Sequence, residues 1–321
     1  MHSFNELVGL FEERFTSSLP FPDTPETLYE PCRYFLGIGG KRVRPVICLM
    51  SNELFGPINQ NAWHAAVAIE LFHNFSLIHD DIMDKAPLRR GQQTVHERNG
   101  LTAGILCGDI LSIYAYEQLA AISHSLSNIL HLYNKTSIEV CEGQQLDMDF
   151  EKREDVTIEE YINMIRLKTS VLLACSLKMG ALLGGSTEGN ADKLYEFGKN
   201  LGIAFQLQDD YLDAFGNAEK TGKQNGGDIR SNKKTYLLLK ALENADTIQA
   251  TEIANLLTSD HPEKVEQMLR LFRETGADEA CKLEVAKYSN AAFNCLEDVA
   301  VLSKRKIHLK NLAEYLLQRE N

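Results

Sequence analysis

The stretch that decides the fold is LIHDDIMD, residues 77–84, which closes a long apolar run. At the helical period Asp80 and Asp84 lie one turn apart on one face, and Asp81 is one position round from Asp80. Pro87 follows, so the acids stand at the C-terminal end of a helix, where the helix dipole favours cations. Two carboxylates about 5 Å apart repel by roughly 3 kcal/mol at an effective dielectric constant near 20. A site for hard divalent cations such as Mg²⁺ explains that cost, and a surface patch does not.

A second copy of the pattern is FQLQDDYLD, residues 205–213, where an apolar helical run again ends in acids at i, i+1 and i+4. One copy could arise by chance in a chain of this length, but two copies at the ends of apolar runs are much less probable. The sequence therefore predicts a two-sided acidic metal site with the ligands Asp80, Asp81, Asp84, Asp209, Asp210 and Asp213.

Composition narrows the class of protein. The chain has 321 residues, enough for one large helical domain or two domains, and a formal net charge of -12. No lysine or arginine run could track a nucleic-acid backbone, so nucleic acid is not an expected partner. The seven cysteines form no CxxC pair, which predicts reduced thiols rather than a zinc site. The N-terminus lacks a signal-peptide pattern and Lys178 interrupts the most apolar stretch, so we expect a soluble cytoplasmic protein without a transmembrane segment.

Helical periodicity dominates the rest of the chain. No alternation of useful length predicts a strand, and no proline occurs between Pro87 and Pro262, so the fold class is all-α. The expected helices are 3–17, 101–124, 127–148, 157–183, 191–215, 237–257, 262–275, 278–302 and 309–317, in addition to the helix that ends at the first acidic cluster.

A basic segment precedes the first acidic helix. The run GGKRVRP, residues 39–45, places two glycines before a helix N-terminus, where backbone amides can bind an anion. Lys41, Arg42 and Arg44 add three cations. A turn followed by a solvated basic face is the alternative.

Three further residues near the first cluster could bind phosphate. His73 is two turns before Asp80 on the same face, although a lone histidine on an apolar helix is usually a satisfied core residue. Arg89 and Arg90 follow Pro87, and guanidinium groups match phosphate oxygens. Ion pairs between these arginines and the nearby aspartates are the alternative.

Polar residues interrupt two apolar helices and need partners, which a ligand cavity would supply. They are Gln144 and Asp147 in one helix, and Lys168 and Thr169 in the next. The glycine-rich composition of segment 216–231 predicts a mobile loop, which could bring Lys223 and, beyond it, Lys233 over a bound anion. A plain solvated loop is equally consistent with the sequence.

The ordered motifs GGKRVRP, HDDIMD, LRRG, GQQLD, KT, FQLQDDYLD and GGDIRSNKKTY cover nearly the whole chain. In this respect the chain resembles the trans-isoprenyl diphosphate synthases, the family of farnesyl and geranylgeranyl diphosphate synthases. The resemblance implies one domain over residues 1–321, a bundle of antiparallel helices around a deep central cavity, usually as a homodimer. It also implies head-to-tail condensation of isopentenyl diphosphate with dimethylallyl, geranyl or farnesyl diphosphate.

The resemblance assigns roles to individual positions. It implies that Asp80, Asp84 and Asp209 ligate three Mg²⁺ ions that hold the allylic diphosphate, with Asp81, Asp210 and Asp213 in support. The positions that match isopentenyl diphosphate binding are Lys41, Arg44, His73 and Arg90. Those that match allylic diphosphate binding are Arg89, Lys168, Lys223 and Lys233. Thr169 and Gln206 match the path of the developing cation, and Gln144 and Asp147 match polar residues beside the cavity.

Product length in such a family depends on the depth of the cavity below Asp80. The floor positions are Ser76 and Phe75, with Phe72 about one turn deeper, which suggests a product of fifteen or twenty carbons. An ideal helical wheel turns Phe75 away from the Asp80 side. The alternatives are a longer-chain polyprenyl diphosphate synthase, a class I terpene cyclase and a non-catalytic partner subunit. GGKRVRP speaks against the cyclase, and the two complete acidic clusters speak against the partner subunit.

Overall fold

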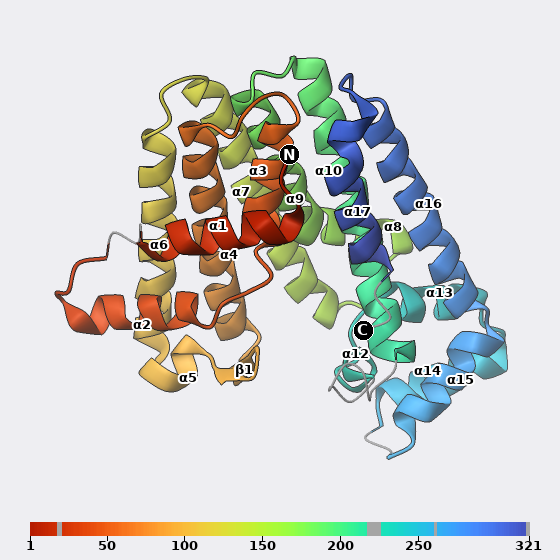
Figure 1. The fold of residues 1–321 in the computed structure, drawn as a ribbon. Helices are drawn as coiled ribbons and strands as arrows, with labels where there is room; N and C mark the ends of the chain where they lie inside the picture. The colour runs from red at the N-terminus through yellow and green to blue at the C-terminus, as the bar shows by residue number, and fades with distance from the viewer. Residues whose placement is uncertain (18–20, 217–225, 260–261, 319–321) are drawn as a thin grey trace. The chain divides into compact units, whose positions relative to one another are not determined.

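The computed structural model describes residues 1–17, 21–216, 226–259 and 262–318. This part of the chain is almost wholly helical, with one short hairpin (Figure 1), and the predicted all-α class is confirmed. No helix among the described residues is long and apolar enough to cross a membrane.

The elements of the first half are α1 (Phe4–Ser17), α2 (Glu26–Gly37), α3 (Val43–Glu53), α4 (Gln60–Met83), β1 (Leu88–Arg89), β2 (Gln92–Gln93), α5 (Val95–Asn99), α6 (Leu101–Ala120) and α7 (Leu126–Lys152). Those of the second half are α8 (Ile158–Ile165), the π-helical turn η1 (Arg166–Ser170), α9 (Val171–Leu183), α10 (Glu188–Phe215), α12 (Gly227–Arg230), α13 (Tyr236–Asn244), α14 (Thr247–Leu257), α15 (Lys264–Glu274), α16 (Ala277–Glu297) and α17 (Ser303–Leu317).

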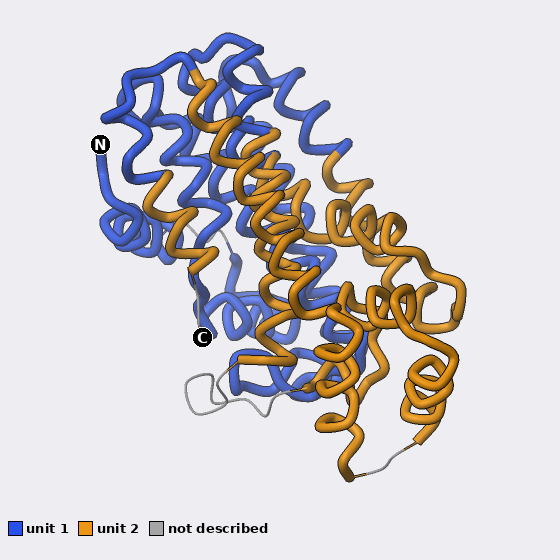
Figure 2. Tube along the Cα trace, turned by 90° about the vertical axis from the view of Figure 1, so that its right-hand side faces the viewer, with its two compact units in different colours: residues 1–135, 175–195, 300–309 blue, residues 136–174, 196–299, 310–321 orange. Residues whose placement is uncertain are grey.

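The chain forms two compact units (Figure 2). Unit 1 comprises residues 1–135, 175–195 and 300–309, and unit 2 comprises residues 136–174, 196–299 and 310–321. The first acidic cluster therefore belongs to unit 1 and the second to unit 2.

Unit 1 is built around α4, which packs on α3 and α6. Small residues allow the close approach: Ala62, Ala65 and Ala66 on α4 are fully buried. The C-terminal part of α9 packs just as closely on α3, because a Cβ added at Gly180 would lie 2.0 Å from the carbonyl oxygen of Cys48. The Asn52 amide donates a hydrogen bond to the Gly180 carbonyl oxygen at 3.1 Å and fixes that contact.

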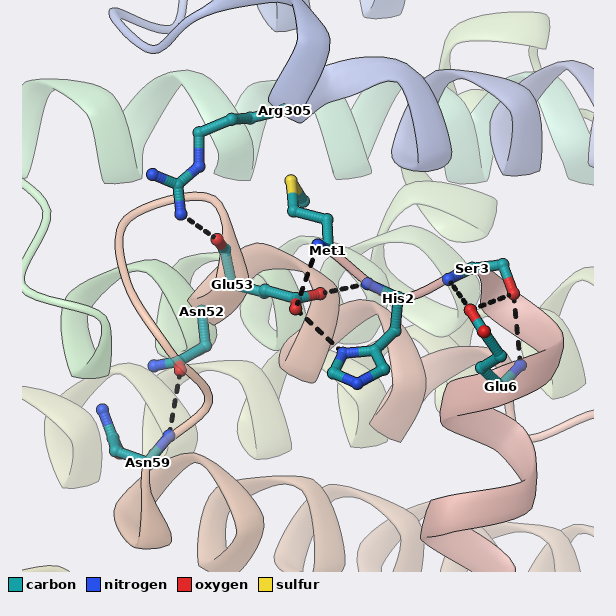
Figure 3. Close-up of polar contacts among 8 residues, drawn as sticks. All are labelled: Met1, His2, Ser3, Glu6, Asn52, Glu53, Asn59 and Arg305. Atoms are coloured by element: carbon teal, nitrogen blue, oxygen red, sulfur yellow. Dashed lines mark hydrogen bonds and ion pairs between the residues drawn. The ribbon is translucent and has the colours of Figure 1, made fainter.

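Polar contacts around Glu53, at the end of α3, hold the first residues of the chain in unit 1 (Figure 3). The buried Glu53 carboxylate accepts a hydrogen bond from the His2 backbone amide at 2.9 Å and lies 2.8 Å from Nδ1 of the His2 ring. Arg305 donates to the backbone carbonyl of Glu53 at 2.9 Å. This network connects three segments that are far apart in the sequence.

Unit 2 has its own apolar core, which includes the fully buried side chains Leu207, Ile253 and Leu271. Within it α13 packs on α16 and on α8. Gly202 of α10 lies against η1, since a Cβ there would be 2.6 Å from the Cα of Ser170. The core thus holds the turn that carries Lys168 and Thr169 against the helix that carries the second acidic cluster.

Three sequence expectations were wrong in detail. The expected helix 237–257 is two helices, because Asp246 caps α14 by accepting from the amides of Ile248 and Gln249 at 2.8 Å. The expected helix 157–183 contains the π-turn η1. Residues 88–93 form an antiparallel hairpin where no strand was expected, and Arg90 and Gly91 at its tip have positive φ.

Candidate active site

The first acidic cluster stands at the C-terminal end of α4, as the sequence predicts. The helix ends at Met83, and the Asp84 amide still donates to the Asp80 carbonyl at 2.8 Å. Asp80 is partly exposed and Asp84 is exposed. Both carboxylates can therefore be reached by a ligand from solvent.

Asp81 differs from its neighbours because its side chain is buried. Arg89 Nε lies 2.8 and 2.9 Å from the two Asp81 carboxylate oxygens, and Arg89 Nη2 is 2.7 Å from Oδ1. Burial raises the pKa of Asp81, while the bonds from Arg89 oppose the rise. This pair connects the acidic helix end to the hairpin. The alternative role for Arg89, an ion pair with a nearby aspartate, is present in the structure.

A cationic group lies beside the cluster in unit 1. Arg44 Nη1 is 3.2 Å from His73 Nε2, and because arginine can only donate, the ring nitrogen accepts. Burial and the positive charges of Arg44 and Arg90 hold the pKa of His73 well below its ordinary value. Burial also lowers the pKa of Arg44 to about 10. His73 is therefore neutral, with its proton on Nδ1.

The glycine pair before α3 meets the second arginine of the hairpin. A Cβ on Gly40 would lie 2.9 Å from Arg90 Nη1, so the guanidinium of Arg90 rests on the glycine backbone. Lys41, the next residue, is exposed. Four of the predicted diphosphate-binding side chains, Lys41, Arg44, His73 and Arg90, thus belong to one unit, and contacts join the three segments that carry them.

Arg42 is an exception to the expectation that it adds a cation for an anion. Its side chain is buried, and its guanidinium donates to Glu12 and Glu70 at 2.6 Å each. The Arg42 side chain points inward because its backbone, at the N-cap of α3, has a φ of 49°. The expected role for Arg42 was wrong.

The predicted floor residues lie along α4. The ring of Phe72 is buried, 5.5 Å from the ring of Phe75 and 5.5 Å from the ring of Tyr133. Phe75 and Ser76 are partly exposed. Ser76 Oγ donates to the backbone carbonyl of His73 at 2.9 Å. Three aromatic rings therefore cluster at the level of Phe72, about two helical turns before Asp80.

The second acidic cluster lies in the last two turns of α10. Asp209 is exposed, whereas Asp210 is buried and accepts hydrogen bonds from the Tyr161 hydroxyl and, at 3.1 Å, from Gln206 Nε2. Burial, together with the nearby charge of Asp228, raises the pKa of Asp210 to about 7. A Thr169 hydroxyl donates to Gln206 Oε1 at 3.4 Å and extends the chain of polar contacts into η1.

Asp213 is held from the other side of the cluster. Its carboxylate accepts from the Asp228 amide at 2.9 Å, and its carbonyl accepts from the Gly226 amide at 2.7 Å. Burial raises the pKa of Asp228, and Lys233 lowers it. Lys223 lies outside the described residues. Sequence reasoning missed Asp228, whose signal is its place in GGDI, and Tyr161, which has no sequence signal beyond an ordinary helix.

The polar residues of α7 meet η1. Lys168 Nζ is 2.5 Å from Asp147 Oδ2, and a Cβ on Gly143 would lie 2.3 Å from the Lys168 amide nitrogen. Among the described residues, neither polar atom of the buried Gln144 amide has a hydrogen-bond partner. A buried amide without partners suits a position next to a ligand.

The donor set fits a hard divalent cation. Within residues 1–17, 21–216, 226–259 and 262–318, no three histidine, cysteine, aspartate or glutamate side chains are arranged to hold a metal ion. Mg²⁺ usually takes one or two carboxylates and completes its shell with waters and substrate phosphates. Burial is the main cause of the raised pKa of Asp81, of Asp210 and of Asp228. A cation bound beside any of these carboxylates would favour its charged form.

Comparison with known proteins agrees with the motifs. The polyprenyl synthetase family model matches residues 25–275. The chain is 38% identical to the short chain isoprenyl diphosphate synthase of Methanothermobacter thermautotrophicus, over 93% of this chain and 92% of the relative. It is also 38% identical to the geranylgeranyl diphosphate synthase of Methanosarcina mazei, over 92% and 91%.

A solved structure gives the same result. The geranylgeranyl pyrophosphate synthetase from Pyrococcus horikoshii Ot3 superposes with a TM-score of 0.92 at 37% identity and 98% coverage of both chains. The chain therefore belongs to the polyprenyl synthetase family, and it is a trans-prenyltransferase.

Proposed function

We propose that this enzyme condenses isopentenyl diphosphate with an allylic diphosphate, head to tail and in trans geometry, with release of diphosphate. The observation that carries the proposal is the cationic group of Arg44 and Arg90 in unit 1, which lies with the neutral ring of His73 at the start of α3, next to the acidic end of α4. A terpene cyclase needs no site for a second diphosphate, and a non-catalytic subunit needs neither complete acidic cluster.

Both acidic clusters act on the allylic diphosphate in this proposal. Asp80, Asp84 and Asp209 would ligate Mg²⁺, three ions in all, with Asp81, Asp210 and Asp213 in support. The bound metal supplies Lewis-acid neutralisation of the diphosphate oxygens. The exposure of Asp84 and Asp209 and the fixed orientation of Asp81, Asp210 and Asp213 support this division of roles.

The remaining side chains neutralise charge and steer the substrate. Lys168, Lys233, Lys223 and Arg89 hold the allylic diphosphate as its carbon–oxygen bond breaks. The Thr169 hydroxyl and the Gln206 amide offer dipoles to the cation that forms, and their mutual hydrogen bond fixes them. The double bond of isopentenyl diphosphate attacks this cation. No described side chain is placed as a dedicated base, so we assign the final proton to the released diphosphate.

We propose geranylgeranyl diphosphate as the main product. The Methanosarcina mazei relative, at 38% identity over 92% of this chain, and the Pyrococcus structure carry that name. The aromatic floor of Phe72 and Phe75, with the small Ser76 between them and Asp80, agrees with an intermediate product length. Farnesyl diphosphate requires a shallower floor, and a longer polyprenyl chain requires a deeper one.

We also propose a homodimer. α6 exposes apolar side chains at helical spacing, among them Leu101, Leu106, Ile113 and Tyr116, and Ile113 is 62% exposed. Such a face is costly in water and is usually covered by a partner.

The direct test is incubation with labelled isopentenyl diphosphate, Mg²⁺ and each allylic primer in turn, followed by chromatography of the products. We expect twenty-carbon product, no turnover with EDTA, and losses of at least about 100-fold in kcat/KM for Asp80→Asn and Asp209→Asn. The proposal would be overturned if the wild-type enzyme incorporated no isopentenyl diphosphate with any of the primers.

A further inference from the structure

We propose that Glu70 and Arg42 are positioning residues, which hold the GGKRVRP segment so that Lys41 and Arg44 face a bound diphosphate. The inference rests on the proposed isopentenyl diphosphate site and deepens it. Neither residue is expected to touch substrate, because the side chains of Arg42 and Glu70 are only 2% and 3% exposed.

The backbone of Arg42 needs external support. Its φ of 49° lies in the left-handed region, which is unfavourable for a residue other than glycine. Arg42 is also the N-cap of α3 and makes no side-chain capping bond. A loop in this conformation persists only where its surroundings determine it.

The guanidinium of Arg42 supplies that support. Nη1 donates to Glu70 at 2.6 Å, Nε donates to Glu12 at 2.6 Å, and Nη2 donates to the carbonyl of Leu36 at 3.3 Å. The group also lies over the ring of Phe15, with Cζ 5.2 Å from the ring centroid. These contacts connect α1, the end of α2 and α4 to the residue between Lys41 and α3.

Glu70 is fixed on its own helix. The Asn74 amide donates to Glu70 Oε1 at 2.9 Å and to the Glu70 carbonyl at 2.7 Å, one turn along α4. α4 also carries His73, the partner of Arg44. The Glu70–Arg42 pair therefore sets the position of the loop relative to the helix that completes the cationic group.

Stability alone does not account for this pair. Replacement of a buried ion pair by apolar residues of similar size is often neutral or stabilising, so such a pair is weak evidence for a role in folding. Glu70 has a second electrostatic effect, because its charge partly opposes the lowering of the pKa of Arg44 and Arg90 by burial. Both guanidinium groups are charged at neutral pH, so this effect alone does not explain the placement of Glu70.

Two substitutions separate positioning from a simple effect of charge. Glu70→Asp keeps the negative charge but shortens the reach to Arg42, whereas Glu70→Gln keeps the shape and removes the charge. If Glu70 acted only through its negative charge, Glu70→Asp would leave KM for isopentenyl diphosphate unchanged. Glu70→Gln would then lower this KM, because the charge that repels the diphosphate is removed. Positioning predicts a higher KM in both variants.

The experiment measures KM for each substrate, kcat, and binding of inorganic diphosphate by calorimetry. We expect Glu70→Asp and Arg42→Lys to raise KM for isopentenyl diphosphate by about 10-fold, with KM for the allylic substrate and kcat within about 2-fold of wild type. Glu53→Asp is the matched control, because it shortens another buried carboxylate of unit 1 that is not linked to the cationic group.

An unchanged KM in Glu70→Asp, a lower KM in Glu70→Gln, or an equal rise of both KM values would overturn the proposal. A rise of the same size in Glu53→Asp would also overturn it, because loss of folding would then explain the effect. Thermal unfolding, monitored by circular dichroism, shows whether each variant is folded. If Glu70→Asp is not folded, Arg42→Lys provides the test in its place. Failure of the wild type to use isopentenyl diphosphate would instead contradict the proposed function.

Discussion

The ring of His73 shows how a single residue can be kept in one protonation state. Its Nε2 accepts from Arg44, and burial and the surrounding arginines lower its pKa well below the ordinary value. The sequence predicted the residue and its face from its distance to Asp80. It could not predict the neutral state, because that depends on Arg44 and Arg90, which come from two other segments.

This environment makes the stability of the protein depend on pH. The unfolded chain gives histidine a pKa of about 6.5, so at lower pH the unfolded state binds a proton that the native state rejects. We expect the free energy of unfolding to be unaffected by His73 above about pH 7.5 and to fall as pH decreases through about 6.5. Urea denaturation of wild type and His73→Gln at several pH values measures the difference. Parallel pH profiles for the two proteins would contradict the prediction.

The aromatic floor gives a second prediction for single residues. Phe72 packs on Phe75 and Tyr133, and in the proposed site the removal of a ring would deepen the cavity that holds the growing chain. We expect Phe72→Ala and Phe75→Ala to shift the product by at least one five-carbon unit, read by reversed-phase chromatography. Phe55→Ala, a partly exposed ring in the same unit, should leave the product distribution unchanged. Unchanged chain length in both floor variants would place the floor elsewhere.

At the scale of elements, the π-turn η1 is the feature that the sequence signalled but did not specify. Lys168 and Thr169 are polar residues inside an apolar helix, and π-turns are frequent at functional sites. Helical periodicity alone nevertheless predicts one continuous helix through both residues. The π-turn depends on tertiary contacts, because Gly143 and Gly202 both pack against the backbone of η1. The split at Asp246 was missed for a different reason, because its capping box lies inside a continuous helical pattern.

The approach of α7 to η1 can be tested with one added methyl group. A Cβ at position 143 would lie 2.3 Å from the Lys168 amide nitrogen, so Gly143→Ala must displace the turn. We expect a loss of stability of about 1 to 3 kcal/mol and at least a 10-fold loss of kcat, because Lys168 and Thr169 move together. Gly189→Ala is the matched control, since that helical glycine has no atom within 4 Å of an added Cβ. Wild-type kcat in Gly143→Ala would show that η1 does not position the reacting groups.

At the scale of the whole molecule, the sequence predicted the all-α class and the family, because both depend on patterns repeated along the chain. The positions of the acids at the ends of α4 and α10 followed from the same periodicity. Side-chain direction in irregular segments did not. Arg42 was expected to face a ligand, and a left-handed backbone turns it inward instead.

The proposed homodimer is a property of the whole molecule and can be broken by one charge. Ile113 on α6 is 62% exposed, and Ile113→Glu would place a carboxylate in the centre of the apolar face. We expect the molar mass from light scattering to fall from dimer to monomer, with helix content retained. Ile248→Glu on α14 is the control, because Ile248 is 79% exposed outside that face. A monomeric wild type, or a dimeric Ile113→Glu, would contradict the proposal.

The π-turn between α8 and α9 has a consequence for insertions and deletions. Such a turn contains one residue more than an α-turn, so a helical wheel drawn from Ile158 misplaces each residue after Ser170 by about 100°. Loss of one residue within 166–170 would restore a regular helix and keep both flanking faces in register. The same loss elsewhere in the helix would rotate its downstream half out of the core. The deletion that the fold tolerates best therefore falls in the turn that carries Lys168 and Thr169. Such a deletion would preserve the fold but displace the two side chains that the proposed reaction needs.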